Sequence, residues 1–362
     1  MKVILYSLGF IYDVVQLANS LSQKIDTTLL IPIQGYQSFV RDAKSPVLSP
    51  MLNTFFFKHH TYPSLREVKS IVKKIEEINP DVIHLQPCTW LNLALPFLKK
   101  YPIVTTIHDV FPMKGRTMTM VNYPFQILQM GFSDKLLVWG NYTKKRLQNR
   151  WGISEKKIDV VPYGGHEIFQ KWGVNDFAES KNIVLFFGQI HEHKGLDYLI
   201  KSEPIVRKEV PDLKIIIAGK GRLPPELADK TKDKSFQVHN YFIPYPYLIE
   251  LLKKSSIVAF PYIEATQSGG MFMAFAFEKA IVATKVGNFP EYVDAWKTGL
   301  IVPPKDPNAL AEAIIYLLKN EDVRRKMGRE GYNKMKSEFS WDISAKKHIQ
   351  IYERLLKEKS KN

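Results

Sequence analysis

The sequence is poor in cysteine and has no long apolar run, and both absences restrict where the protein works. Cys88 is the only cysteine among the 362 residues, so no internal disulfide can form, which favours a reducing compartment. We interpret Cys88 as a small apolar core residue. No uncharged apolar window reaches about 18 residues, so we expect no transmembrane helix. The opening MKVILYSLGF lacks a small-residue cleavage site and predicts a first strand of a cytoplasmic protein.

An excess of acidic residues is also absent, because the formal net charge is +15 at pH 7. The basic excess is denser in residues 1–150, where two stretches carry cations at helical spacing: Arg66, Lys69, Lys73 and Lys74, and then Lys144, Lys145, Arg146 and Arg150. Such a face either only solubilises the protein or meets anionic lipid headgroups or a phosphate-bearing acceptor. No aromatic–basic RNA-binding signature and no DNA-reading helix pattern accompanies the charge, so we expect no nucleic-acid partner.

Short apolar segments alternate with helical patterns in the first half of the chain. The expected strands are 3–8, 27–32, 82–86, 102–108, 135–139 and 158–163, and the expected helices are 12–24, 64–78, 90–99 and 141–150. Near-continuous apolar runs of this length are typical of strands buried on both faces of a parallel sheet. The alternation therefore predicts βαβ units and a doubly wound, Rossmann-like α/β sheet.

The alternation restarts at 183–188 and continues to a helix that begins near residue 307, where Asp306 is placed to cap it and Pro307 fits its first position. We therefore predict two domains, 1–165 and 166–340, followed by a C-terminal helix in 341–362 that crosses back to the first domain. Ligands bind at the carboxyl ends of parallel strands, and two such sheets are expected to face a central cleft. The residues that follow the strands are the place to look for function.

Two strand-end segments of the second half carry phosphate-binding chemistry. In IVLFFGQIHEHKG a strand ends at Gly188, Gln189 follows, and Lys194 precedes a helix whose N-terminal amides suit an anion. The second segment, IEATQSGG, follows another strand and leads into an apolar helix; its polar and glycine residues are Thr266, Gln267, Ser268, Gly269 and Gly270. Glycines let backbone amides approach a diphosphate closely. The alternative interpretations are an ordinary exposed lysine at 194 and a plain helix cap at Ser268.

Together these segments resemble the retaining GT-B glycosyltransferases of family 4, also called glycosyl transferases group 1. FFGQIHEHKGLDYLI resembles the diphosphate loop of that family, and GGMFMAFAFEKAIVATKVGNFPEYVDAWKTGLIVPPKDPNALAEAI resembles its donor-binding region. INPDVIHLQ, PIVTTIHD and SDKLLVW resemble its N-terminal domain. The resemblance covers essentially the whole chain and implies transfer of a sugar from a UDP- or GDP-sugar to a lipid-linked or glycan acceptor in polysaccharide or glycolipid assembly.

The resemblance also implies roles for residues outside the two segments. His108 matches a histidine that contacts the transferred sugar, and Asp109 is placed to orient its ring; the alternative is a pair that caps the next segment. Gly9 matches a glycine loop near the donor phosphates, although a lone turn glycine is the alternative. The expected nucleoside contacts are Gly219, Phe242 and Ile243, which could equally be core. Glu264 and Glu291 are further candidates, the latter matching a common family glutamate.

The sequence departs from the family pattern at the donor site. Gln189 stands where an arginine is usual, and Ala265 and Met273 stand where two glutamates eight positions apart are usual. Glu264 lies one position before the first of them. The TQSG loop resembles that of a subgroup without the glutamate pair, so we interpret the change as an altered grip on the donor. Lys194 and the backbone must then carry more of the diphosphate charge.

The implied reaction needs neither metal nor cofactor. His191 and His193 lie two apart with no suitable cysteine or carboxylate pair nearby, which argues against a metal site. The implied mechanism passes through an oxocarbenium-like state, with charge growing on a leaving nucleoside diphosphate and with domain closure excluding water. Three alternatives remain open from the sequence: a nucleotide-sugar epimerase, a non-catalytic nucleotide-sugar-binding subunit and a partner subunit. We expect the enzyme in the cytoplasm or peripherally at the inner membrane face.

Overall fold

The computed structural model describes residues 1–41, 47–58, 65–86, 92, 94–110, 117–172, 177–223 and 225–361, with the backbone only for 117–123. Cys88 lies outside the described residues. The chain forms two compact units. Unit 1 comprises the described residues of Met1–Pro112, Thr117–Gly164 and Phe339–Asn362, and unit 2 those of Gly165–Glu338. Each unit is described by itself below.

Unit 1 is built on a seven-stranded sheet among the described residues, in the order β3-β2-β1-β4-β5-β6-β7. Every pairing in it is parallel. The strands are β1 (Lys2–Tyr6), β2 (Asp26–Pro32), β3 (Asn53–Phe57), β4 (Val82–Leu85), β5 (Ile103–Thr106), β6 (Lys135–Val138) and β7 (Ile158–Val160). The sequence prediction missed β3, an edge strand with half-exposed side chains that lacks the buried run of its neighbours.

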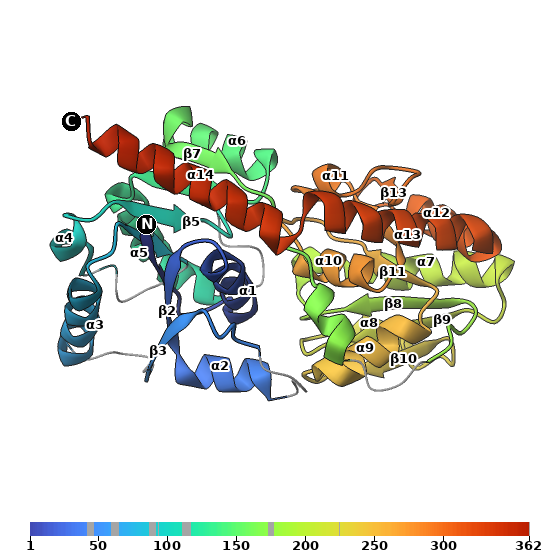
Figure 1. Cartoon of the computed structure of the whole chain (residues 1–362). Helices are drawn as coiled ribbons and strands as arrows, with labels where there is room; N and C mark the ends of the chain where they lie inside the picture. Colours follow the sequence, from blue (N-terminus) through green and yellow to red (C-terminus); the bar gives the residue numbers. More distant parts are fainter. Residues whose placement is uncertain are drawn as a thin grey trace. The chain divides into compact units, whose positions relative to one another are not determined.

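The helices of unit 1 alternate with these strands (Figure 1). They are α1 (Ile11–Ser22), α2 (Ile33–Val40), α3 (Leu65–Ile78), α4 (Leu95–Leu98), α5 (Thr117–Phe132), α6 (Asn141–Trp151) and α14 (Trp341–Lys359), with a 3-10 turn η2 (Glu155–Lys157). The sequence prediction missed α2 and α5, which contain Gly35 and Pro124 respectively. Both residues weaken a helical pattern, so tertiary packing decides these two helices.

The C-terminal helix α14 belongs to unit 1 and packs against α1. Ser340 caps it, its hydroxyl accepting from the backbone N–H of Ile343 at 3.3 Å. Its inner face buries Trp341, His348 and Tyr352, the last with no exposed side-chain surface. Two of these are polar, so the last helix of the chain brings hydrogen-bonding groups into the interior of the first unit.

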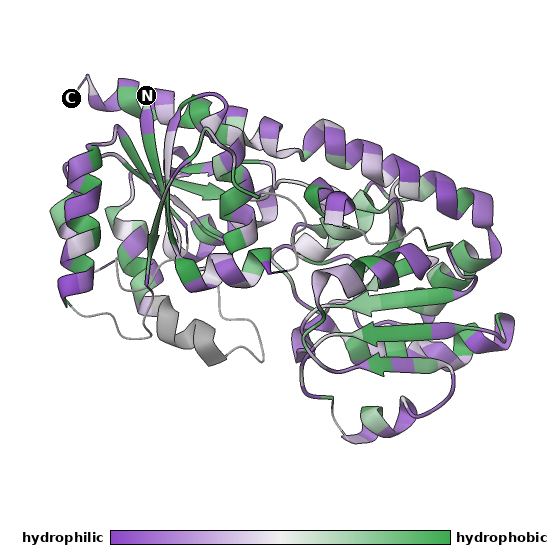
Figure 2. Ribbon diagram, turned by 60° about the horizontal axis from the view of Figure 1, so that its bottom comes forward, coloured by the Kyte–Doolittle hydropathy of each residue, from purple (hydrophilic) through white to green (hydrophobic). Residues whose placement is uncertain are grey.

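Unit 2 repeats the architecture with a six-stranded parallel sheet, in the order β10-β9-β8-β11-β12-β13. Its strands are β8 (Ile183–Phe187), β9 (Lys214–Ala218), β10 (Phe236–His239), β11 (Ile257–Phe260), β12 (Ala280–Thr284) and β13 (Gly299–Val302). The strands of both sheets are largely hydrophobic in Figure 2, as burial on both faces requires.

The helices and 3-10 turns of unit 2 are η3 (Glu167–Trp172), η4 (Glu192–Lys194), α7 (Leu196–Glu209), α8 (Pro225–Lys230), α9 (Tyr245–Lys254), α10 (Gly269–Ala276), α11 (Phe289–Tyr292), α12 (Pro307–Lys319) and α13 (Glu321–Glu338). The predicted cap of α12 is confirmed. One carboxylate oxygen of Asp306 accepts from the backbone N–H groups of Asn308 and Ala309, each at 3.0 Å, and Pro307 occupies the first helical position.

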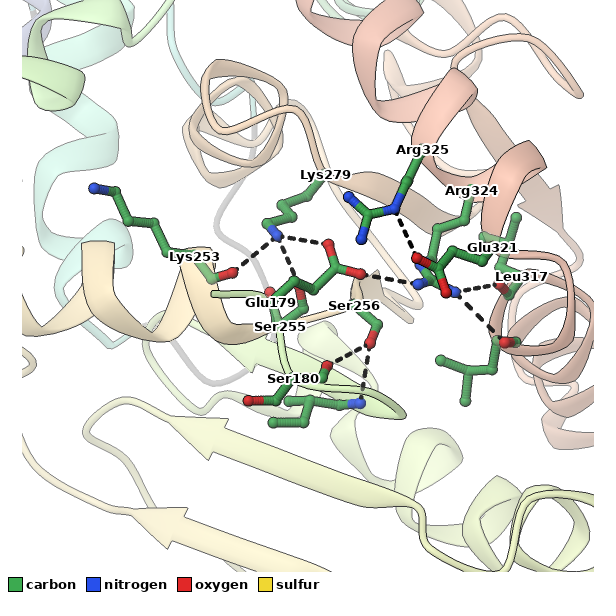
Figure 3. A network of polar contacts seen from close by, with 12 residues as sticks. Glu179, Ser180, Lys253, Ser255, Ser256, Lys279, Leu317, Glu321, Arg324 and Arg325 are labelled. Carbon is green, nitrogen blue, oxygen red and sulfur yellow. Dashed lines mark hydrogen bonds and ion pairs between the residues drawn. The ribbon is translucent and has the colours of Figure 1, made fainter. Parts of the chain in front are cut away.

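A buried ion network ties the segment before β8 to the rest of unit 2 (Figure 3). Lys279 donates to the carboxylate of Glu179 at 3.1 Å and to the backbone carbonyls of Lys253 and Ser255 at 3.0 and 2.8 Å. Arg324 donates to the other oxygen of Glu179 at 2.9 Å. Removing one partner of such a buried pair typically costs about 3–5 kcal/mol, because the other charge is left buried and unpaired.

A cavity of about 470 Å³ opens beside this network, lined among others by Gln170, Arg325 and Arg329. It lies where β8, β11 and β12 begin, whereas ligands of open α/β sheets bind where strands end. The buried cations on its wall already bond Glu179 and backbone carbonyls. We therefore assign this region to holding unit 2 together.

Candidate functional site

The strand order of each sheet creates a crevice at the carboxyl ends of two central strands. In unit 1 the chain turns away in opposite directions after β1 and β4, and in unit 2 after β8 and β11. Such a switch point is the usual ligand site of an open parallel sheet. The segments that follow these four strands contain Gly9, Gln86, the loop 188–195 and the loop 262–270.

In unit 2, the loop after β8 brings the lysine predicted from sequence back over the strand end. Gly188 has a left-handed φ of 109°, and a Cβ placed on it would lie 3.0 Å from the Lys194 ammonium nitrogen. Gly195 also has a positive φ, 61°, and lies against the backbone carbonyl of Pro261. Glycine is needed at both positions, because a side chain would strain the backbone and fill the space. Gln189 is exposed, and its side-chain amide oxygen lies 3.2 Å from Nε2 of His191.

The half-buried Lys194 is held by Tyr262, a residue that the sequence analysis did not single out. Its ammonium group donates to the hydroxyl of Tyr262 at 2.8 Å and lies 4.8 Å from the centre of that ring. The Tyr262 hydroxyl lies 3.4 Å from the hydroxyl of Ser268. Lys194 and Ser268, predicted separately, thus come together through Tyr262, which is 3% exposed.

Backbone contacts lock the two loops of unit 2 to each other. The N–H of Ile263 donates to the carbonyl of His193 at 2.9 Å. On the other side, the N–H of Asn288 donates to the carbonyl of Thr266 at 3.1 Å, and Gly287, with a φ of 55°, lies against the same segment. Glu291 is half-buried in the following turn, and its N–H donates to the Asn288 carbonyl at 2.9 Å. The loops therefore form one preorganised strand-end surface.

The amino end of α10 is part of this surface. Ser268 occupies the N-cap position, and its side chain makes no cap hydrogen bond to the first turn. The first two helical residues are Gly269 and Gly270, and Gly270 packs closely on the Phe187 and Phe260 rings. A helix start without a side-chain cap presents amide N–H groups and a partial positive charge. Together with Lys194, this arrangement suits a polyanion.

The two positions where the family usually has glutamates are buried and apolar. Ala265 and Met273 are each 3% exposed, while Glu264 is half-exposed. An unpaired carboxylate at position 273 would be costly to bury, so the surrounding packing is that of an apolar side chain. The candidate site of unit 2 therefore has no carboxylate at either of these two positions.

The remaining candidates of unit 2 follow β9 and β10. Gly219 lies against the carbonyl of Gly188, so close that a Cβ would overlap it, which joins its turn to the lysine loop. Phe242 is 72% exposed and Ile243 is half-exposed. The exposed ring of Phe242 follows the end of β10, where a planar ligand could stack on it.

In unit 1, His108 follows β5 and is almost completely buried. Its Nε2 atom lies 2.8 Å from the amide oxygen of Gln86, the residue that follows β4. Phe10 stacks on the ring with centroids 3.9 Å apart, and Trp139 meets it edge-on at 5.7 Å. Burial lowers the pKa of His108 to about 3, so the imidazole is neutral at physiological pH.

The neighbours of His108 include the other two predicted residues of unit 1. Asp109 is half-buried, and its backbone carbonyl accepts from the side-chain amide of Gln126 at 2.6 Å. Gly9 follows β1, and its N–H lies 3.2 Å from the hydroxyl of Ser7. The next residue, Phe10, has a left-handed φ of 51° and exposes 43% of its surface. Sequence reasoning missed Phe10 and Gln86, since neither residue type signals a site by itself.

Within the described ranges, no three histidine, cysteine, aspartate or glutamate side chains gather as metal ligands would. None of the helices in that part of the chain has both the length and the apolar character needed to cross a bilayer.

Family models divide the chain much as its two sheets do. Residues 13–164 match the model described as Glycosyltransferase Family 4, and residues 168–334 match the model described as Glycosyl transferases group 1. The chain belongs to glycosyltransferase family 4. Its two parallel α/β sheets are those of the GT-B fold, as the resemblance in sequence implied.

Relatives and solved structures agree with this assignment. An uncharacterized glycosyltransferase of Methanocaldococcus jannaschii is 26% identical over 56% of this chain, and the match spans 54% of that relative, about half its length. The D-inositol 3-phosphate glycosyltransferase of Corynebacterium glutamicum strain R is 24% identical over 76% of this chain and 73% of its own. The structure of Anabaena HepE in complex with UDP has a TM-score of 0.72 at 14% identity, covering 98% of this chain and all of that one.

Proposed function

We propose that this family 4 chain transfers a sugar from a nucleoside diphosphate sugar to an acceptor, with retention at the anomeric carbon. The observation that carries the proposal is the arrangement around Lys194 in unit 2. The lysine is bonded to Tyr262, next to the uncapped amino end of α10, at the switch point of a parallel sheet. A lysine, helix amides and glycines at one strand end form a binding surface for a diphosphate.

The diphosphate would bind to Lys194, to the N–H groups of Gly269 and Gly270, and to the hydroxyl of Ser268. These donors would stabilise the negative charge that grows on the leaving group as the glycosidic bond breaks. They are fixed before substrate arrives, because Tyr262 and the backbone of the loops hold them. Gln189 and the TQSG loop would contribute neutral hydrogen bonds in place of the charged residues that the family usually has.

The nucleoside would lie along the ends of β9 and β10, close to Gly219, Phe242 and Ile243. The exposed ring of Phe242 offers a face for the base, and the turn at Gly219 touches the lysine loop through Gly188. Glu264 and Glu291 are the candidate carboxylates for ribose or sugar hydroxyls. The HepE complex contains UDP, and the donor of this chain is proposed to be a UDP- or GDP-sugar.

The transferred sugar would contact His108 from unit 1, with Asp109 beside it. A neutral imidazole exchanges hydrogen bonds with hydroxyl groups without placing a positive charge beside an oxocarbenium-like centre. No described carboxylate is assigned as a nucleophile. We therefore favour attack of the acceptor from the face of the leaving group, with the departing phosphate oxygen taking the acceptor's proton.

The acceptor is proposed to be lipid-linked or a glycan near an anionic surface. On α3 the side chains of Arg66, Lys69 and Lys73 are exposed along one stripe, and Leu65 at the start of the helix is 77% exposed. Cations next to an exposed apolar side chain suit the interface of an anionic membrane. A role in polysaccharide or glycolipid assembly at the cytoplasmic membrane face would follow.

A second candidate is a non-catalytic subunit that binds nucleotide-sugar, and the buried Ala265 and Met273 favour it. A donor panel separates the two. Purified chain is mixed with UDP-, GDP- and ADP-sugars, and the released nucleoside diphosphate is followed with and without membrane extract. Extract-dependent release with one donor would establish the transferase and its donor. Binding of nucleotide-sugar without release from any donor would refute catalysis in favour of the non-catalytic subunit.

A further inference from the structure

A chain of buried hydrogen bonds in unit 1 runs from His108 to the C-terminal helix. His108 Nε2 lies 2.8 Å from the Gln86 amide oxygen, and the Gln86 amide nitrogen donates to the Thr106 hydroxyl at 3.2 Å. That hydroxyl lies 2.8 Å from Nε2 of His84, whose Nδ1 lies 2.6 Å from the Tyr352 hydroxyl of α14. All five side chains are at most 3% exposed, so the bonds have no competition from bulk water.

The main chain of Gln86 is fixed independently of its side chain. Its backbone N–H donates to the carbonyl of Tyr6 at 2.8 Å, which continues the pairing of β4 with β1. Its backbone carbonyl accepts from the side-chain amide of Gln129 at 3.3 Å. The backbone at the switch point therefore fixes where the Gln86 side chain begins. The side chain extends to the end of the neighbouring strand β5, which His108 follows.

Packing alone does not determine which ring nitrogen of His108 faces the interior. Phe10 covers one face of the ring and Trp139 meets it edge-on, so together they set the plane of the imidazole. A rotation of the ring by about 180° around its Cβ–Cγ bond keeps this plane and exchanges the nitrogen and carbon positions with little change in shape. A hydrogen bond from a fixed partner is what distinguishes the two orientations.

We propose that Gln86 is a positioning residue, which holds His108 as the neutral Nε2–H tautomer in a single ring orientation for sugar transfer. The Gln86 amide nitrogen is committed to Thr106, so the amide oxygen faces the ring and accepts a hydrogen from Nε2. Nδ1 is then the acceptor of the imidazole. The inference rests on the proposed function for the role of His108, while the tautomer itself is a property of the free protein.

The decisive experiment is nitrogen-15 NMR of the histidine rings at pH 7, without donor or acceptor, with His108→Ala used to assign the signals. The wild type is expected to show His108 with its proton on Nε2. Gln86→Met, which keeps shape but removes the acceptor, is expected to give a mixture of tautomers or an exchange-broadened ring. Gln86→Glu restores an acceptor oxygen and should restore the Nε2–H form. A wild-type ring protonated on Nδ1, or an unchanged spectrum in Gln86→Met, would overturn the proposal.

A matched pair of isosteric variants covers the case in which Gln86→Met does not fold. Thr106→Val removes the acceptor that orients the Gln86 amide, whereas Thr105→Val removes an equally buried hydroxyl that bonds Ser133 at 2.7 Å instead. The first is expected to disturb the His108 signals and the second to leave them unchanged. If Thr106→Val and Thr105→Val changed the His108 signals equally, the proposed role of Thr106 in orienting the Gln86 amide would be contradicted.

Kinetics then connect the tautomer to the reaction. With the donor from the panel, Gln86→Met is expected to lower kcat on the order of 10-fold, the usual scale for a residue that orients a functional imidazole, with little change in donor KM. A tautomer change in NMR with unchanged kcat would refute the positioning role in transfer. Failure of the wild type to transfer from any donor would refute the proposed function, and the NMR result would still decide how Gln86 holds His108.

Discussion

The two units share a strand order around their central strands, yet their strand ends are built in opposite ways. In unit 2 the site consists of backbone and glycine: Gly188, Gly195 and Gly219 sit where a side chain would overlap a neighbour or strain the chain, and Lys194 supplies one cation. In unit 1 the corresponding place is filled by the partly exposed Phe10, the buried neutral His108 and the buried Trp139. Under the proposed function, one fold thus offers a surface for a polyanion and a surface for a neutral, hydroxylated group.

The strand-end sites of the two units depend on different structural features. Amides and a lysine held in place act on charge at close range, so the site in unit 2 depends on how closely the ligand can approach the backbone. The site in unit 1 depends on the orientation of a ring, which is set by partners from distant parts of the chain. Substitutions at the strand ends of unit 2 should therefore change how well charge is stabilised. Substitutions at the strand ends of unit 1 should change the orientation of the His108 ring.

The largest expected effect comes from removing the cation of unit 2. Lys194→Ala should lower kcat by about 10²–10³-fold, the scale seen when one donor to developing charge is removed. The measurement is steady-state release of nucleoside diphosphate at saturating acceptor. Lys194→Arg keeps the charge but changes the shape of the donor that bonds Tyr262, so its kcat should lie between those of the wild type and Lys194→Ala. A kcat within threefold of the wild type for Lys194→Ala would remove the diphosphate role.

Acid should destabilise unit 1 through its buried neutral histidines. Burial lowers the pKa of His348 to about 4 and that of His84 well below its usual value, as it does for His108. Below pH 6.5 each takes up a proton on unfolding, so stability falls as pH falls. Asp13 acts in the opposite sense, because burial raises its pKa to about 7 and unfolding releases its proton.

On unfolding, the three histidines take up protons and Asp13 releases one, so unit 1 takes up about two protons net between roughly pH 4.5 and 6. The stability of unit 1 therefore falls by roughly 3 kcal/mol per pH unit as the pH falls. In unit 2, burial lowers the pKa of His166 to about 3 and also lowers that of His239, while the raised pKa of Glu167 opposes their effect. Hydrogen exchange followed by mass spectrometry across this range should show the unit 1 strands losing protection first. Earlier loss in the unit 2 strands would contradict the comparison.

Removing the support of the lysine should have a smaller effect than removing the lysine. Tyr262→Phe deletes the hydroxyl that lies between Lys194 and Ser268 but keeps the ring under the ammonium group. Loss of a hydrogen bond to a charged group is worth about 1.5–3 kcal/mol, which predicts a loss of about 10- to 100-fold in kcat/KM for the donor. An unchanged kcat/KM would show that the ring alone holds the lysine.

The smallest effect tests the glycines of the two strand ends against each other. Gly188→Ala forces an alanine to a φ of 109° next to Lys194 and should destabilise the chain by about 1–2 kcal/mol. Gly9→Ala meets no atom within 4 Å and needs no left-handed backbone, so the melting temperature should be unchanged. If Gly188→Ala and Gly9→Ala lowered the melting temperature equally, unit 1 would also require glycine at its strand end.

Much of the architecture could be predicted because it is encoded locally. Apolar runs gave the central strands of both sheets, and Asp306 with Pro307 marked the start of α12. The segments around Lys194 and Ser268 were each predicted as strand-end binding segments, and in the structure Tyr262 contacts both residues. The edge strand β3 and helices α2 and α5 were missed, since packing rather than local pattern determines them.

The supporting residues could not be predicted, because their partners are distant in sequence. His84 and Tyr352 are separated by 268 positions and meet only when α14 packs on unit 1. Tyr262 lies two residues after the end of β11, and its sequence context indicates only core. Gln86 is a polar residue after a strand like several others, and its contact with His108 depends on the order of β4 and β5 in the sheet.

The central claim is that the strand ends of unit 2 hold the diphosphate of the donor. The most direct test is a crystal structure of the chain with UDP, and with GDP in parallel. The account predicts phosphate density within hydrogen-bonding distance of the Lys194 ammonium group and of the backbone amides of Gly269 and Gly270. A diphosphate bound elsewhere on the chain, with Lys194 still bonded only to Tyr262, would contradict it.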